Sequence, residues 1–269
     1  MNAKDILIRL AIKSKGDWDK EIEAIKEHDG DVENIAIGEA DSHVITIIDA
    51  DYPQGLRNGY KPPLVLFYEG DKGIIDKLGS VKAVSFVGTR NPSKYSAKKV
   101  AELAAACAKM GVVVITGLAA GIETVAAKAA LDAKGKVIAV LGNGFSARYP
   151  AENSDLYDQI AKEGIVISEY PSDVAPETFS FPARNRIVAS LANAIIVGQA
   201  TTRSGCIITV NYALGHNAEI GCLPHEADPD DEGNLLISEG AQLIQTGTDV
   251  AALLGMTEIP EAKTEPKAE

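Results

Sequence analysis

The sequence has little cysteine and no long hydrophobic run. Its three cysteines, Cys107, Cys206 and Cys222, are odd in number and lack C-x-x-C spacing, which excludes a disulfide framework and a structural zinc site. No stretch of about 18 apolar residues occurs, which excludes a membrane span. Charged residues interrupt the apolar pattern of the first ten positions, which excludes a secretory signal. These absences predict a protein of the reducing cytoplasm.

The chain also lacks the composition of a disordered or fibrous protein. Of its 269 residues, 46% are hydrophobic and 24% are charged, and the mean hydropathy is +0.01. This length allows one large α/β domain with an appendage, or two smaller domains.

The net charge of −12 is unevenly distributed. Residues 80–210 contain 14 Lys and Arg against 10 Asp and Glu, whereas residues 1–79 are net negative by 6 and residues 211–269 by 10. A polyanion would therefore have to dock on the middle of the chain. An uneven charge distribution is also common in proteins that bind no polyanion, where it increases solubility. On charge alone, this explanation is favoured over a polyanion-binding site.

The order of apolar runs predicts the fold. Residues 1–45 have apolar positions near helical spacing but too few for a core, and they predict a small helical N-terminal segment. Residues 46–254 predict one Rossmann-like domain, because short runs from VKAVSFVG to AEIGCLP alternate with glycine-bearing turns and helical spacing. The fold class is α/β: an extended Rossmann-like, doubly wound, mostly parallel sheet of about six strands with a short helical N-terminal extension. VITIID and LVLFYEGD, which precede these runs, read as extended. The polar residues 255–269 predict a disordered tail.

Five segments between predicted strands and helices have the chemistry of an anion site. They are residues 88–93, 116–121, 142–144, 179–186 and 201–205. Ligands of an open α/β sheet bind at this edge, where glycine admits a phosphate close to the backbone and arginines and hydroxyls donate to its oxygens. Neither G-x-G-x-x-G nor a P-loop occurs, which disfavours a dinucleotide cofactor and an NTPase. We expect no cofactor and no metal.

A catalytic site is not indicated. The histidines, serines and cysteines near the strand ends lack nucleophile-elbow or metal-ligand spacing. Glu169 follows a predicted strand, where it serves either as a general base or as a group that orients Arg184 or Arg186. Phe179 and Phe181 offer stacking faces for bases, although at least one is expected to be buried. The arginines are expected to be exposed, so their replacement should change stability little.

These segments also carry a resemblance to a known family. The strings SFVGTRNPSKYS, TGLAAGIETVAAKAAL, KVIAVLGNGFSARYPAEN and FSFPARNRIVASLANAIIVGQATTRSGC, in this order, resemble the DNA-processing protein A family, also called DprA or Smf. The resemblance extends from about Asp49 to Leu254. It implies a homodimer without established catalysis, which binds single-stranded DNA, protects it and helps to load a RecA-type recombinase in natural transformation.

The resemblance also implies which residues contact phosphate. Its G-T-R, R-N-R and R-S-G motifs, with two glycines of the second loop, correspond to Gly88, Thr89, Arg90, Gly117, Gly121, Arg184, Asn185, Arg186, Arg203, Ser204 and Gly205. The sequence departs from the family pattern at several positions. An arginine and an aspartate of the second loop are Ala120 and Glu123, and a histidine four residues further on is Ala127. The usual Pro-Gly after the late strand is Pro224-His225, and the glycine before the closing segment is Glu232. One alternative is an enzyme or sensor for a small nucleoside phosphate, with Glu169 or Glu123 assisting glycosidic cleavage. Another is a pure interaction module whose acidic ends dock a partner.

Overall fold

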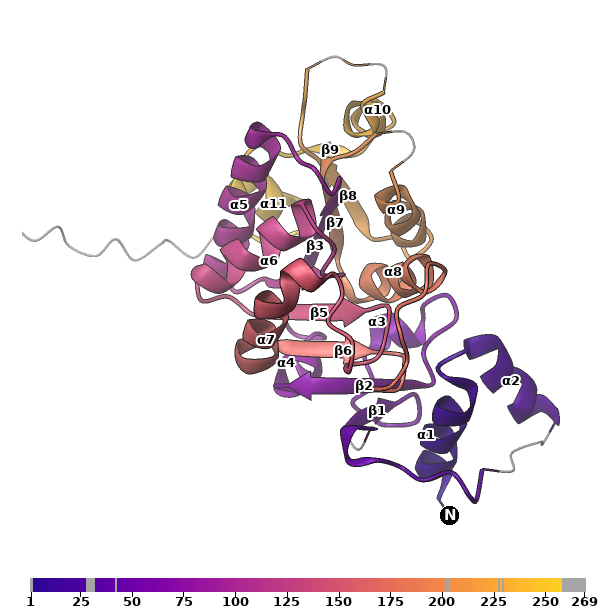
Figure 1. The fold of residues 1–269 in the computed structure, drawn as a ribbon. Helices are drawn as coiled ribbons and strands as arrows, with labels where there is room; N and C mark the ends of the chain where they lie inside the picture. The colour runs from indigo at the N-terminus through magenta and orange to yellow at the C-terminus, as the bar shows by residue number, and fades with distance from the viewer. Residues whose placement is uncertain are drawn as a thin grey trace, which may run out of the picture.

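A nine-stranded mixed sheet with the order β1-β2-β6-β5-β4-β3-β7-β8-β9 runs through the molecule (Figure 1). The computed structural model describes residues 2–27, 32–41, 43–201, 204–226, 228 and 230–257. The strands are β1 Val44–Thr46, β2 Val65–Gly70, β3 Ala83–Gly88, β4 Val113–Thr116, β5 Val137–Leu141, β6 Ile165–Ser168, β7 Ala194–Gln199, β8 Glu219–Cys222 and β9 Gln242–Leu243.

Most of the sheet is parallel. Neighbouring strands from β3 to β9 pair in parallel, whereas β2 is antiparallel to both β1 and β6. The six continuous apolar runs form β3 to β8, so the predicted Rossmann-like fold class is confirmed. The two extended segments before them form β1 and β2. β9 was not predicted, because a strand of two residues has no readable pattern in the sequence.

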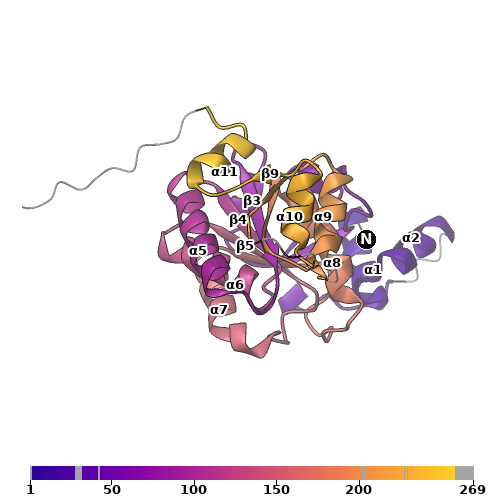
Figure 2. The same ribbon diagram turned by 90° about the horizontal axis from the view of Figure 1, so that it is seen from above.

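Helices cover both faces of the sheet (Figure 2). On one face lie α5 Lys94–Lys109, α6 Ile122–Asp132, α7 Ser154–Glu163 and α11 Gly247–Leu253, and on the other lie α3 Gln54–Arg57, α8 Ser180–Leu191, α9 Cys206–Leu214 and α10 Glu232–Ser238. The other helices are α1 Ala3–Ser14, α2 Trp18–Glu27, α4 Gly73–Asp76 and the 3₁₀ turns η1 Glu39–Asp41 and η2 Ala151–Asn153.

The parallel strands are apolar throughout because each one faces two cores. In β4, Val114 packs in the core that contains Val100 of α5, whereas Val113 and Ile115 pack in the core that contains Ile187 of α8. A strand covered on both faces has no position at which a polar side chain reaches water. The chain winds to one side of β3 through β4, β5 and β6 and to the other through β7 and β8, so the order reverses at β3. Ligands of such folds bind at this reversal.

Of the two N-terminal helices, α1 packs directly on the sheet and α2 packs on α1 (Figure 1). Ile8 and Ala11 of α1 share a core with Val65 and Phe67 of β2. β1 begins at Val44, so the sheet begins before the boundary that we placed between residues 45 and 46. Within the predicted tail, residues 258–269 lie outside the described part of the chain. Among the helices that the structure describes, none combines the length and apolarity needed to cross a lipid bilayer.

Candidate nucleic-acid interface

Two of the predicted segments, 88–93 and 116–121, meet beside the end of β7 at the carboxyl edge of the parallel strands. Thr89 donates its backbone N–H to Gln199 O at the end of β7 (2.8 Å) and accepts from the N–H of Ile122 at the start of α6 (3.2 Å). A Cβ atom on Gly121 would lie 2.3 Å from Thr89 O, and this glycine has φ +81°. Gly121 is therefore required by the contact between loops 88–93 and 116–121.

Glu123 occupies the amides of the second loop. Its Oε2 accepts from the backbone N–H groups of Gly117 (2.7 Å) and Ala119 (3.4 Å), while Thr116 Oγ1 accepts from Leu118 N–H (2.9 Å). A carboxylate at the N-terminus of α6 thus takes the place that an anion would take. Because these backbone N–H groups are already bonded, loop 116–121 has few free hydrogen-bond donors for a ligand.

Of the three predicted arginines that the structure describes, Arg90 is the one that faces solvent. It is exposed on the first loop, and none of the carboxylates in the described part of the chain lies within ion-pair distance of it. Ser93 caps α5 by accepting from Ser96 N–H (3.1 Å), and the next residue, Lys94, is also exposed. Arg90 and Lys94 place two unburied cations beside the N-terminus of a 16-residue helix. This is the part of the edge best suited to a phosphate.

Arg184 is buried, and our expectation that it is exposed is wrong. Only 4% of the residue is accessible, and its guanidinium donates to Gly117 O and Val140 O. Its Nε donates to the side chain of Asn185 (3.1 Å). Burial lowers the pKa of this arginine. Arg184 therefore ties α8 to the ends of β4 and β5, and its guanidinium is the reason why residue 117 has no room for a side chain.

Arg186 is buried as well, on a different side of α8. Its guanidinium forms an ion pair with Glu169, and the two side chains are only 5% and 4% exposed. Of the two roles considered for Glu169, the structure shows the orienting one. Burial raises the pKa of Glu169, and the charge of Arg186 opposes this shift. Glu21 of α2 is buried nearby, and desolvation together with the charge of Glu169 raises its pKa to about 8.

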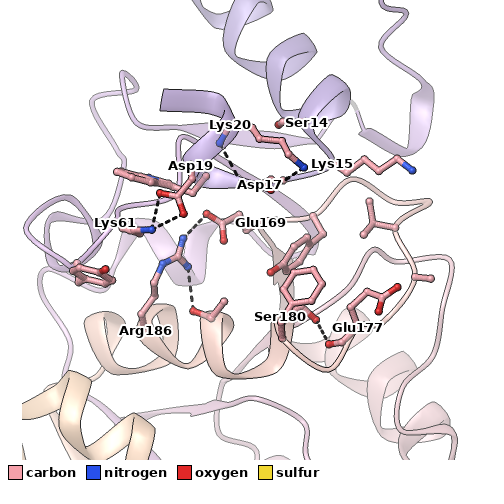
Figure 3. Close-up of a pocket in the computed structure, with 18 of the residues that line it drawn as sticks. Ser14, Lys15, Asp17, Asp19, Lys20, Lys61, Glu169, Glu177, Ser180 and Arg186 are labelled. Carbon is pink, nitrogen blue, oxygen red and sulfur yellow. Dashed lines mark hydrogen bonds and ion pairs between the residues drawn. The ribbon is translucent and has the colours of Figure 1, made fainter. Parts of the chain in front are cut away.

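This ion pair lies in the wall of a cavity of about 720 Å³ (Figure 3). The cavity lies between the turn joining α1 to α2, the loop around Lys61, the segment after β6 and the start of α8. Lys61 Nζ contacts Asp19 at 2.7 Å and lies 5.1 Å from the centre of the Trp18 ring. Sequence reasoning missed this cavity, because its walls come from parts of the chain more than 100 residues apart.

The last predicted segment follows β7. Arg203 lies outside the residues that the structure describes. Ser204 accepts from Cys206 Sγ (3.2 Å), and Gly205 is exposed with no atom within 4 Å of where its Cβ would be. Both lie at the start of α9, at the same edge of the sheet.

Aromatic rings lie near this edge. Phe179 is 69% exposed, while Phe181 is half-buried against the exposed Tyr149, with ring centres 5.0 Å apart. We expected at least one of the two phenylalanines to be buried, but Phe181 is only partly buried and Phe179 is exposed. Phe179 presents a free face to a ligand.

A polar cluster beside α5 was also missed. His225 Nε2 lies 2.9 Å from Ser96 Oγ, and His225 Nδ1 lies 3.3 Å from Asp231 Oδ2. Ser96 is completely buried, so no substrate reaches it. The cluster joins α5 to the loop after β8. The only signal of this cluster in the sequence was that His225 stands where the family usually has a glycine after Pro224.

Cys222, at the end of β8, is fully buried, as expected, and burial raises its pKa to about 12. The described residues contain no group of three or more His, Cys, Asp or Glu side chains placed to hold a metal.

The family model of the DNA recombination-mediator protein A matches residues 43–255. The chain belongs to this family. It is 40% identical over 209 residues to the DNA processing protein DprA of Streptococcus pneumoniae, covering 77% of this chain and 72% of that one, and 37% identical over 221 residues to DprA of Bacillus subtilis, covering 81% and 72%. It spans about half of the length of the 38% identical protein Smf of Synechocystis.

Two solved structures of family members share the fold. DprA of Streptococcus pneumoniae has a TM-score of 0.73 at 35% identity and covers 87% of this chain and 80% of its own. DprA of Helicobacter pylori, described for its single-stranded DNA binding mode, has a TM-score of 0.70 at 30% identity, with 78% and 95% covered. The resemblance inferred from the sequence motifs is thus confirmed.

Proposed function

We propose that this chain binds single-stranded DNA at the carboxyl edge of its parallel strands, with Arg90 as the principal phosphate contact. The observation that carries the proposal is an exposed arginine that has no carboxylate partner among the described residues. It lies on a loop held at the reversal of strand order by contacts to β7 and α6. Support also comes from the Helicobacter pylori relative, whose structure is described for its single-stranded DNA binding.

Unpaired bases are favoured over duplex for a physical reason. Phe179 and Tyr149 are 69% and 43% exposed, so their rings are accessible to bases that have left a stack. In a duplex these base faces are covered by neighbouring pairs. The ring contacts therefore add affinity for a single strand, whereas contacts to phosphate do not distinguish the two forms as strongly.

A fluorescence-anisotropy titration with labelled oligo-dT at two salt concentrations tests the proposal. Arg90→Ala should weaken binding severalfold and lower the salt slope by about one unit or less, since one phosphate contact is lost. Lys82→Ala is the matched control, because Lys82 is exposed just before the amino end of β3, at the opposite edge of the sheet. Equal binding by Arg90→Ala and Lys82→Ala contradicts the proposal. Saturation by a mononucleotide with slow turnover would instead favour the nucleotide enzyme.

The cellular role that we propose is the family's: the bound strand is protected and passed to a RecA-type recombinase in the cytoplasm. We also propose a homodimer formed through the open edge at β9, where Leu243 is 42% exposed and Leu235 of α10 is 45% exposed. Light scattering should give twice the mass of one chain, and Leu243→Asp should give the mass of one. A wild-type chain of single mass at working concentration contradicts the dimer.

A further inference from the structure

The cavity beside Arg186 is rich in aromatic side chains. The chain has 8 Tyr, 5 Phe and 1 Trp, and five of these fourteen residues line this one cavity: Trp18, Tyr60, Tyr170, Phe179 and Tyr212. Tyr60 is 54% exposed and stacks on Tyr212 with 6.0 Å between ring centres. One face of the Tyr60 ring is therefore supported by another ring. Aromatic faces grouped in this way bind planar ligands by stacking.

The charges of the cavity disfavour a phosphate in its interior. Five carboxylates and four cations line it, which leaves a net negative charge. Three of the cations are already paired, in the contacts Lys61 to Asp19 (2.7 Å), Lys20 to Asp17 (3.0 Å) and Arg186 to Glu169 (Figure 3). The lining groups outside these pairs are Asp173, Glu177 and Lys15, so the cavity has a net charge of −1, which disfavours a phosphate.

A cationic ligand is also disfavoured, because the protein supplies its own cation. Lys61 Nζ lies 5.1 Å from the centre of the Trp18 ring and 5.9 Å from that of Tyr60, and it is paired with Asp19. Lys61 thus already occupies the position next to the aromatic rings where an external ammonium or guanidinium group would bind most favourably. What remains suits an uncharged, planar ligand with hydrogen-bonding edges. Lys61 and Asp19, which are 29% and 71% exposed, present a donor next to an acceptor for such an edge.

The cavity adjoins the proposed DNA site through α8. Phe179 and Ser180 line the cavity at the start of this helix, and Ser180 Oγ donates to Gly142 O at the end of β5. One turn further on, Arg184 contacts the ends of β4 and β5. Helix α8 thus forms a wall of the cavity and also packs against the loops that follow β4 and β5.

We propose that this cavity takes a nucleobase of the bound single strand, stacked on Tyr60, with its polar edge toward Lys61 and Asp19. The phosphates of that strand remain outside, on the side of Arg90. This inference rests on the proposed function. It assigns to the N-terminal segment, which supplies Trp18 and Asp19, a share in binding bases.

The test compares two ligands: labelled dT12, and a 12-mer in which every nucleotide is replaced by an abasic analogue. Tyr60→Ala should weaken binding of dT12 by about fivefold or more, since stacking on one aromatic ring is lost. It should leave binding of the abasic 12-mer unchanged, because that ligand has no base to stack. Ile25→Ala is the control, since Ile25 is 44% exposed on α2 and does not line the cavity. Thermal unfolding of each variant verifies that the fold is intact.

The outcomes separate this inference from the proposed function. If Arg90→Ala weakens binding of both ligands while Tyr60→Ala changes neither, DNA binding stands and the base pocket is wrong. If Tyr60→Ala weakens binding of both ligands equally, Tyr60 acts on the sugar-phosphate backbone of the oligonucleotide, and the proposed base pocket is also wrong. If neither ligand binds the wild-type chain, the proposed function itself fails. A second readout is 2-aminopurine placed at alternate positions of the oligonucleotide: its fluorescence should be quenched by the wild-type chain and less by Tyr60→Ala.

Discussion

Arg90, Arg184 and Arg186 were all predicted to contact phosphate, yet Arg90 lies in an environment opposite to that of the other two. Arg90 is exposed on a loop, whereas Arg184 and Arg186 are each 4% accessible and bonded to carbonyl oxygens and to Glu169. The difference teaches that an arginine near a helix start does not identify a ligand contact. Arginine also holds loops in place, because its planar group can satisfy several carbonyls at once. We call the exposed loop 88–93 with Arg90 the rim, and the buried Arg184 and Arg186 of α8 the centre. The rim and the centre should therefore respond to mutation in different ways.

The largest effect is expected from Arg186→Ala. Removing the guanidinium leaves the Glu169 carboxylate buried without a partner, which should lower the free energy of unfolding by about 3–5 kcal/mol. Urea unfolding measures the loss. The double variant Arg186→Ala/Glu169→Gln should recover part of it, because no buried charge remains. If Arg186→Ala is as stable as Arg90→Ala, which should lose less than about 0.5 kcal/mol, the contrast between rim and centre is mistaken.

The next effect depends on pH. The pKa of Glu21 is raised to about 8 in the folded protein, so the native state keeps a proton that the unfolded state releases above the ordinary value of 4.5. Stability should therefore fall as pH rises from about 4.5 to 8, by about 4 kcal/mol from this group. Glu21→Gln should flatten that fall and be the more stable chain at pH 8. A wild-type chain whose urea midpoint rises over this range would exclude a protonated Glu21.

Gly16→Val should have a smaller effect on stability. Gly16 has φ +72°, and a Cβ atom there would lie 2.7 Å from Glu169 O, so the variant combines a strained backbone with a clash. We expect a loss of about 2 kcal/mol. Gly79→Val is the control, because nothing lies within 4 Å of its Cβ position. Equal melting temperatures for the two variants would show that the turn between α1 and α2 does not rest on Glu169.

The smallest effect should come from adding a cation to the rim. Ala120 lies on the loop that contacts Arg90, so Ala120→Arg places a second guanidinium at this edge. Oligo-dT binding should tighten by about 1 kcal/mol, a severalfold gain, with a steeper salt dependence. Ala133→Arg, at the far end of α6, controls for the change in net charge. The same gain in both variants would mean that overall charge, and not the rim, sets the affinity.

The sequence was enough to predict the parallel sheet but not the surroundings of its arginines. Runs such as VIAV and AIIV are typical of strands buried on both faces, and their alternation with helices predicts parallel pairing. The burial of Arg184 depends on carbonyls at residues 117 and 140, which become neighbours only through the pairing of β4 with β5. Ser96 and His225, 129 residues apart, meet for a similar reason. Such contacts have no local pattern.

The two edges of the sheet differ in a way that limits how copies of this chain can assemble. β1 is buried along its whole length, whereas β9 has an exposed leucine and no neighbouring strand on its outer side among the described residues. A chain with a single open edge can add one copy and no more, because joining two such edges uses both of them. Pairing there about a twofold axis gives a closed assembly, whereas two open edges would allow filaments to grow.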